Sequence, residues 1–163
     1  MSGSSATLIT VEKVDASLLP GGVCLGQTPL SFAARHGNLR VVDLLTTAFP
    51  GAEHINRPSS DLGLWPLGEA AKCGHPEVVT MLLERNADVH QRRKNGQTAL
   101  HQAAAQGHAE CVRRLCNAGA DPRAVDDDGR TAADLAATEL DFRHAVKAKV
   151  MGELLRASGV SYQ

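Results

Sequence analysis

The chain is poor in aromatic residues, and this scarcity limits the kind of core that it can form. Aromatic residues make up 3% of its 163 residues, whereas hydrophobic residues reach 43%. The apolar content is therefore mostly alanine, valine and leucine, which suits thin helices that pack closely together. A deep globular core built around large aromatic side chains is not expected.

Further absences exclude whole classes of function. The formal net charge is −1, so the chain lacks the basic excess with which nucleic-acid-binding proteins attract phosphates. No apolar run approaches the length that spans a bilayer, and the opening MSGSSATLIT lacks the pattern of a secretory signal. We expect no nucleic-acid and no membrane partner, a cytoplasmic or nuclear location, and a monomer when unbound.

Sequence patterns for catalysis and for metal or cofactor binding are also missing. Cys111 and Cys116 fall five residues apart on one expected helix and point in different directions, so we expect free thiols that fill the core. Cys73 and His75 are close enough to suggest a thiol nucleophile with a base, but no zinc spacing, phosphate loop or hydrolase motif accompanies them. We therefore predict no catalytic, cofactor-binding or metal-binding residue.

What the chain does contain is an internal repeat. The segment GQTALHQAAAQGHAECVRRLCNAGAD, residues 96–121, recurs in altered copies upstream and downstream. Aligning the residue that opens each copy gives Thr28, Trp65, Thr98 and Thr131, with spacings of 37, 33 and 33 residues. A period near thirty residues is typical of repeat proteins, so we interpret the chain as four stacked units.

The third copy predicts the structure of one unit. Thr98 can cap a first helix over Ala99 to Gln106, which a glycine then ends. Apolar positions at helical spacing predict a second helix over Glu110 to Asn117. The chain then turns back around Asp128-Gly129, a favoured tight-turn pair. Alanine pairs at matching positions of every first helix allow neighbouring helices to approach closely.

These residues resemble the ankyrin repeat, whose consensus runs approximately D-x-x-G-x-T-P-L-H-x-A-A-x-x-G-H-x-E-V-V-x-L-L-L-x-x-G-A-D. The third copy keeps Thr98, Leu100, His101, Gly107 and His108 of that pattern. The resemblance implies an all-α solenoid of helix-turn-helix units joined by β-hairpin loops. Its parts are residues 1–22 as a non-repeat tail or cap, repeats at about 23–60, 61–93, 94–126 and 127–157, the first and last of them degenerate, and a tail at 158–163.

The departures from the consensus are as informative as the matches. The consensus histidine of the first helix is replaced by Ser31, Gly68 and Asp134, so local stability should be uneven. Residues 46–63 contain four additional residues, which predicts an enlarged loop without a regular hairpin. The fourth copy runs on through Phe142 to Leu155, which predicts a long C-terminal helix that ends the stack.

The resemblance implies that a partner protein binds the concave surface formed by the first helices and the hairpin tips. The early units offer basic residues there, and one tip is basic while the next is acidic, so the two tips either neutralise each other or orient a partner. The candidate partner-binding residues are Arg35, His36, Trp65, Lys72, Cys73, Arg92, Lys94, Asn95, Gln106, Asp127, Asp128 and Arg130.

Trp65 is the only tryptophan and occupies the position of the capping threonine. One interpretation is that it packs against Phe49 and Ile55 and holds the enlarged loop. The other is that it anchors a partner, because tryptophan is enriched among interface hot spots.

The sequence therefore favours a non-enzymatic protein-interaction module. A regulatory subunit or substrate adaptor of an enzyme complex is the alternative, and it would need a second surface at either end of the chain. An enzyme dependent on Cys73 and His75 is a remote third hypothesis.

Overall fold

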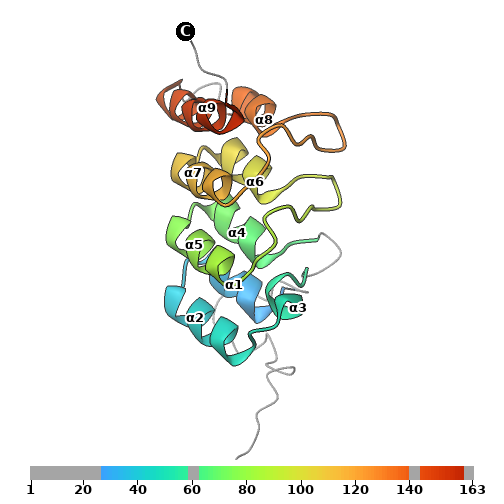
Figure 1. Ribbon diagram of the computed structural model, residues 1–163, viewed down its shortest axis with the longest axis vertical. Coiled ribbons are helices and arrows are strands. Elements are labelled where there is room, and N and C mark those ends of the chain that lie inside the picture. The colour runs from blue at the N-terminus through green and yellow to red at the C-terminus, as the bar shows by residue number, and fades with distance from the viewer. Residues whose placement is uncertain (1–26, 59–62, 140–143, 160–163) are drawn as a thin grey trace, which may run out of the picture.

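The computed structural model describes residues 27–58, 63–139 and 144–159, which form a stack of helix pairs (Figure 1). The first helix of each pair contacts its neighbours in the order α1, α4, α6, α8, and the second in the order α2, α5, α7, α9. The helices are α1 (Pro29–Arg35), α2 (Leu39–Ala48), α3 (Ala52–Ile55), α4 (Pro66–Cys73), α5 (Pro76–Glu84), α6 (Ala99–Gln106), α7 (Ala109–Asn117), α8 (Ala132–Glu139) and α9 (His144–Ser158).

The described part of the chain confirms the predicted all-α stack. In the third unit α6 spans the predicted range, and Gly107 ends it in the left-handed conformation at φ 82°. In the second unit Asn86 adopts φ 66° where the consensus has glycine, a substitution that asparagine tolerates. The loops between units project to one side of the stack (Figure 1). Within the described residues their β structure is limited to one isolated bridge, between Val125 and Thr131.

Small side chains hold the first helices together. Ala70, Ala71, Ala103 and Ala104 are fully buried, because neighbouring helices approach closely enough to exclude water from them. Around this alanine seam the leucines and valines of both helix layers complete one continuous core.

Histidines at the start of the second helices join successive units. His75 Nε2 lies 3.0 Å from the Arg35 carbonyl oxygen, and His108 Nε2 lies 3.1 Å from that of Lys72. A carbonyl oxygen only accepts, so each imidazole donates through Nε2. A Cβ at Gly74 would lie 2.5 Å from His108 Nδ1, so the consensus glycine leaves the space that this ring fills.

The enlarged loop between the first two units includes a helical segment that the sequence did not predict. It contains the short helix α3, and Ile55 at the end of that helix is 1% exposed. Burial of this one side chain attaches the loop to the core. The predicted C-terminal helix is present as α9, while Phe142 lies outside the described residues.

Candidate protein-interaction surface

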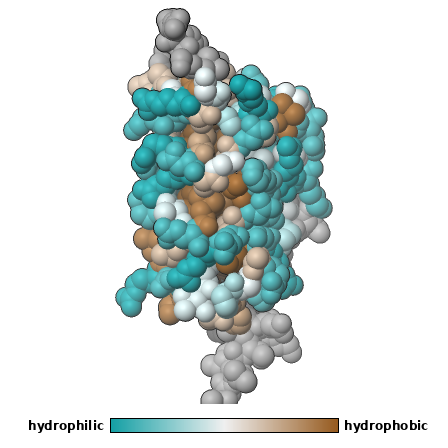
Figure 2. All heavy atoms as spheres, in the orientation of Figure 1, coloured by the Kyte–Doolittle hydropathy of each residue, from teal (hydrophilic) through white to brown (hydrophobic). Residues whose placement is uncertain are grey.

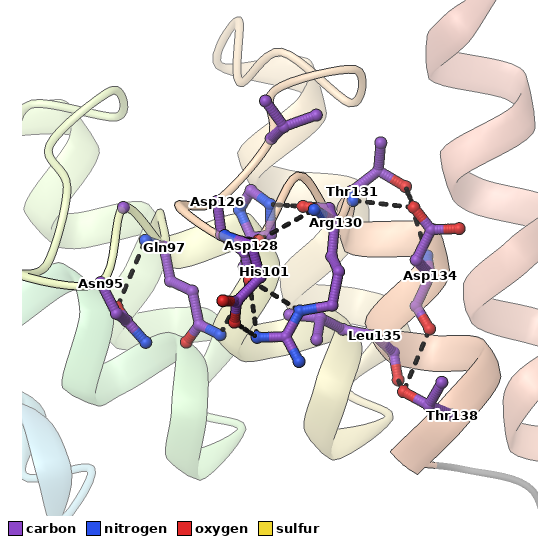
Figure 3. A network of polar contacts seen from close by, with 12 residues as sticks. Asn95, Gln97, His101, Asp126, Asp128, Arg130, Thr131, Asp134, Leu135 and Thr138 are labelled. Carbon is purple, nitrogen blue, oxygen red and sulfur yellow. Dashed lines mark hydrogen bonds and ion pairs between the residues drawn. The ribbon is translucent and has the colours of Figure 1, made fainter.

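The start of each first helix carries a pair of residues three positions apart, and the third unit shows the polar form of this pair. His101 is fully buried; its Nε2 donates to the Arg130 carbonyl oxygen at 3.1 Å. Its Nδ1 is therefore the acceptor, for the Thr98 N–H at 3.2 Å and the Thr98 hydroxyl at 2.9 Å. The pair caps α6, and the bond from His101 to the Arg130 carbonyl oxygen fixes the following loop to this helix (Figure 3).

The first and fourth units keep the cap with shorter side chains. Asp134 accepts both the N–H and the hydroxyl of Thr131, at 2.8 and 2.7 Å, and its own N–H donates back to the Thr131 hydroxyl. These hydrogen bonds from Thr131 lower the pKa of the Asp134 carboxyl. In the first unit the Thr28 hydroxyl accepts the Ser31 N–H at 3.1 Å.

The second unit replaces the polar pair by Trp65 and Gly68. The indole is 1% exposed, and a Cβ at Gly68 would lie 2.8 Å from Cε2 of its ring. The indole thus occupies the space beside the position that His101 fills in the third unit. Its Nε1 has no hydrogen-bond partner among the described residues.

The interpretation of Trp65 as a partner-binding residue is therefore wrong, because a side chain that is 1% exposed offers no area to a partner. Its burial in the core is what the packing interpretation predicts. Ile55 lies in the same buried cluster, whereas the Phe49 ring faces His54, with 5.6 Å between their centroids.

A polar network fixes the acidic loop tip. Asp126 accepts hydrogen bonds from the N–H and the guanidinium of Arg130 and from the Gln97 amide (Figure 3). Burial alone would raise the pKa of this carboxyl, but these hydrogen bonds outweigh it and lower the pKa to about 2. Asp128 forms an ion pair with Arg130 at 2.7 Å. Arg130 and Asp128 thus brace their own loop.

The basic tip is joined to the acidic tip by hydrogen bonds. The Arg92 guanidinium donates to the Val125 carbonyl oxygen at 2.7 Å and to that of Gly96 at 3.1 Å. The Asn95 carbonyl oxygen accepts the Asp127 N–H at 3.2 Å. Within the described residues no ion pair connects the two tips, so Arg92 and Asn95 serve as braces while Asp127 stays exposed.

Four other predicted residues lie at the surface of the stack. Lys72, Lys94 and Gln106 are exposed, and in the described part of the chain no ion pair involves either lysine. His36 is also exposed, and its ring stacks on Phe32 with 4.2 Å between centroids.

Glu69 is a feature that the sequence analysis missed. Its carboxylate is 4% exposed and lies 3.9 Å from Nε of the exposed Arg35. The signal was an acidic residue in a helix position that Phe32 and Gln102 occupy in the neighbouring units. The pair holds the Arg35 side chain over α4 and leaves part of the guanidinium open to solvent.

The three cysteines in the described part of the chain lack the features of a nucleophile. Burial, followed by the nearby Glu69, raises the pKa of Cys73, which is half-buried. Burial also raises the pKa of Cys111 to about 12 and that of Cys116 to about 11. A catalytic cysteine needs a depressed pKa, and the Nε2 atom of His75 is already bonded to the Arg35 carbonyl.

The described residues contain no group of three histidine, cysteine, aspartate or glutamate side chains placed to hold a metal ion. In the same ranges no helix is long and apolar enough to cross a membrane.

Comparison with known proteins decides the family. The family model for ankyrin repeats matches residues 5–93 and 67–148. The chain belongs to the ankyrin repeat family. Ankyrin repeats generally act as protein-protein interaction modules, so a partner protein is the ligand class that this family membership supports. The match begins at residue 5, upstream of residue 23, where the sequence resemblance started.

Ankyrin repeat proteins of a bacterium and of the rat are similar to this chain over 74 residues. A putative ankyrin repeat protein of Rickettsia felis is 42% identical over 74 residues, which is 45% of this chain and 31% of that protein. Ankyrin repeat and SAM domain-containing protein 6 of Rattus norvegicus is 40% identical over 74 residues, 45% of this chain and 8% of the rat protein. The alignment thus spans less than a third of each of these two relatives.

Proposed function

We propose that this chain is a non-enzymatic protein-binding module and that it holds an acidic segment of its partner along three basic residues. Arg35, Lys72 and Lys94 come from the first unit, the second unit and the loop tip before the third, and all three are exposed. Lys72 and Lys94 take part in no ion pair in the described residues, so their charges are available to a partner. Two unneutralised lysines, together with Arg35, whose guanidinium is only partly covered by its pair with Glu69, are the observation that carries the proposal.

The neighbouring loop tip gives the surface a direction. Asp127 is exposed one unit further along the stack from Lys94, and like charges brought together cost several kcal/mol at an interface. An acidic segment is therefore expected to lie over the first three units and to end before this tip. A partner with the reverse charge order would be disfavoured.

The stack supports binding because it is ordered before the partner arrives. The histidine bonds between units and the Arg92 brace between tips fix the spacing of the cations. A surface that is already fixed loses less conformational entropy on binding. The raised thiol pKa values support a role in binding rather than in catalysis.

Selection from a random peptide display library against the purified chain tests this proposal. We expect acidic peptides to be enriched and their affinity to fall as salt is raised, because surface charges are screened. The charge-reversed variant Arg35→Glu, Lys72→Glu, Lys94→Glu should bind selected peptides at least about tenfold more weakly.

Two controls distinguish charge from damage to the fold. The charge-retaining variant Arg35→Lys, Lys72→Arg, Lys94→Arg should bind within about threefold of the parent chain, because charge steers binding more than side-chain shape does. Lys149→Glu reverses an exposed charge on α9 and should leave binding unchanged. Enrichment of neutral or basic peptides, or equal losses in the reversed and charge-retaining variants, would contradict the proposal.

A further inference from the structure

The outward side of the first unit is an unfilled stacking face. Val41 on α2 corresponds by repeat alignment to Val78 on α5 and Cys111 on α7. Val78 and Cys111 are each 1% exposed, whereas Val41 is 37% exposed. The same position is therefore buried in the second and third units, which follow a described unit, and exposed in the first.

The open face is larger than one residue. Leu44, one turn further along α2 on the same face, is 67% exposed. Hydrophobic spheres are visible at the lower left of the stack, where α2 lies (Figure 2). The same unit also has a cavity of about 170 Å³, lined by Pro29 and Leu30 of α1, by Leu45 of α2 and by the enlarged loop. Exposed apolar side chains grouped on one helix face are typical of a surface that something covers.

The chain itself supplies a segment of the right position and composition. Residues 1–26 precede the described part, and Thr28 and Pro29, where the chain enters α1, line the cavity. The family model match includes this region from residue 5 onward. Apolar residues recur in it at Leu8, Ile9 and Val11.

The charges of the two parts are complementary. The segment carries Glu12, Lys13 and Asp15, which leaves it one net negative charge. The open face carries Arg40 on α2 and Arg57 at the rim of the cavity, both of them exposed. Neither arginine takes part in an ion pair within the described residues. At the matching positions α5 and α7 carry Glu77 and Glu110, so the basic residue belongs to this end of the stack.

We propose that residues 5–25 pack against the α1–α2 face as an intramolecular cap, with Leu8, Ile9 and Val11 covering Val41 and Leu44. The cap takes the place of the preceding unit and completes the hydrophobic core of the first unit. It is independent of the acidic partner, since it uses the end of the stack and leaves Arg35, Lys72 and Lys94 exposed.

Amide hydrogen exchange on the full chain tests the cap. One variant changes Leu8, Ile9 and Val11 to serine, a second carries Leu44→Ser, and a third combines them. We expect the first two each to raise exchange of α2 amides by about tenfold, because local opening becomes easier. The combined variant should exchange only slightly faster than either of the first two, since the effects of substitutions at residues in contact do not add.

Internal controls keep the result interpretable. The amides of α6 and α7 should exchange as in the parent chain, which shows that the variants still fold. Val125→Ser removes an apolar side chain that is 44% exposed on a distant loop tip and should change α2 exchange less than about twofold.

Three outcomes would overturn the cap. Exchange rates of the α2 amides that do not change with the N-terminal substitutions would show that the segment does not cover the face. Fully additive effects would show that the two sites do not touch. Protection of α2 that depends on protein concentration and disappears in Leu44→Ser would assign the face to a second copy of the chain instead.

Discussion

The second and third units begin their first helices in opposite ways. In the third unit Thr98 and His101 form a buried polar pair that is bonded on both sides of the imidazole. In the second unit Trp65 and Gly68 stand at the same positions, and the indole fills space that a side chain at residue 68 would need. One unit satisfies its cap by hydrogen bonds, and the other covers it with apolar area.

The two solutions differ in what they connect. His101 reaches the Arg130 carbonyl and thereby attaches the following loop to α6. Trp65 belongs instead to the buried hydrophobic core, which also contains Ile55 of the preceding enlarged loop. The loop backbones nevertheless match: Arg93 N–H donates to the Gln97 carbonyl oxygen at 2.8 Å, and Asp126 N–H to that of Arg130 at 2.9 Å. The scaffold thus accepts either pair, provided that both members change together.

The largest loss of stability should come from removing the Trp65 indole from the second unit. Trp65→Ala deletes a fully buried indole whose neighbours cannot close the space, and we expect a loss of about 3–5 kcal/mol in the free energy of unfolding. Urea denaturation followed by circular dichroism measures this. Thr98→Ala in the third unit is the matched change at the polar cap and should cost only about 1 kcal/mol. Equal losses would contradict the contrast between the units.

A smaller effect tests whether the pair acts as one unit. Gly68→His alone forces a side chain against the indole, and overpacking of this kind costs about 1–3 kcal/mol. Combined with Trp65→Thr, the new histidine has the space and the threonine partner that His101 has. We expect the double variant to be more stable than Trp65→Thr alone, with a coupling free energy of at least about 1 kcal/mol.

The control for this cycle is Gly152→His, at a glycine of α9 where an added Cβ meets nothing within 4 Å. It should show no coupling to Trp65→Thr, because the two sites share no contact. A double variant whose losses simply add would show that the two positions are independent, and the paired exchange would be wrong.

The sequence predicted the units but not these pairs. Period, alanine pairs and helix ends were sufficient for α6 and α7, because each depends on local residue types that repeat at fixed spacing. The burial of Trp65 was left open because it depends on Gly68, whose lack of a side chain only matters once the ring is placed beside it. The reliable features were local, and the unresolved one was a tertiary contact.

The candidate surface shows the same limit. Exposure of Lys72 and Lys94 followed from their repeat positions. Arg92 occupies an equally exposed position, yet its guanidinium is bonded to carbonyl oxygens of two loops. Residue type and repeat position do not tell whether a basic side chain is open to a partner or bonded within the stack. For Arg92 this depends on where the backbone of the next loop places the Val125 carbonyl oxygen.

The smallest predicted effect is a pH dependence of the folding stability that arises from the polar pair of the third unit. Burial lowers the pKa of His101 below its ordinary 6.5, although the Arg130 carbonyl and Asp126 act against this. The unfolded chain therefore binds the proton more readily, and stability falls as pH falls below 6.5 until the folded pKa is passed. Protonation would place an N–H at Nδ1 against the N–H of Thr98, which removes the acceptor of the cap.

His101→Gln isolates this contribution, since glutamine does not titrate. Unfolding free energies of both chains are measured from pH 7.5 to 5, and their difference should shrink as the pH falls through that range. Asp126 does not interfere, because its pKa of about 2 lies far below the window, and the remaining histidines cancel in the difference. In the second unit Trp65→Thr alone should leave this dependence unchanged, because the histidine that titrates belongs to the third unit. A difference that stays constant with pH would mean that His101 binds its proton equally well in the folded and unfolded states and that the polar cap carries no proton linkage.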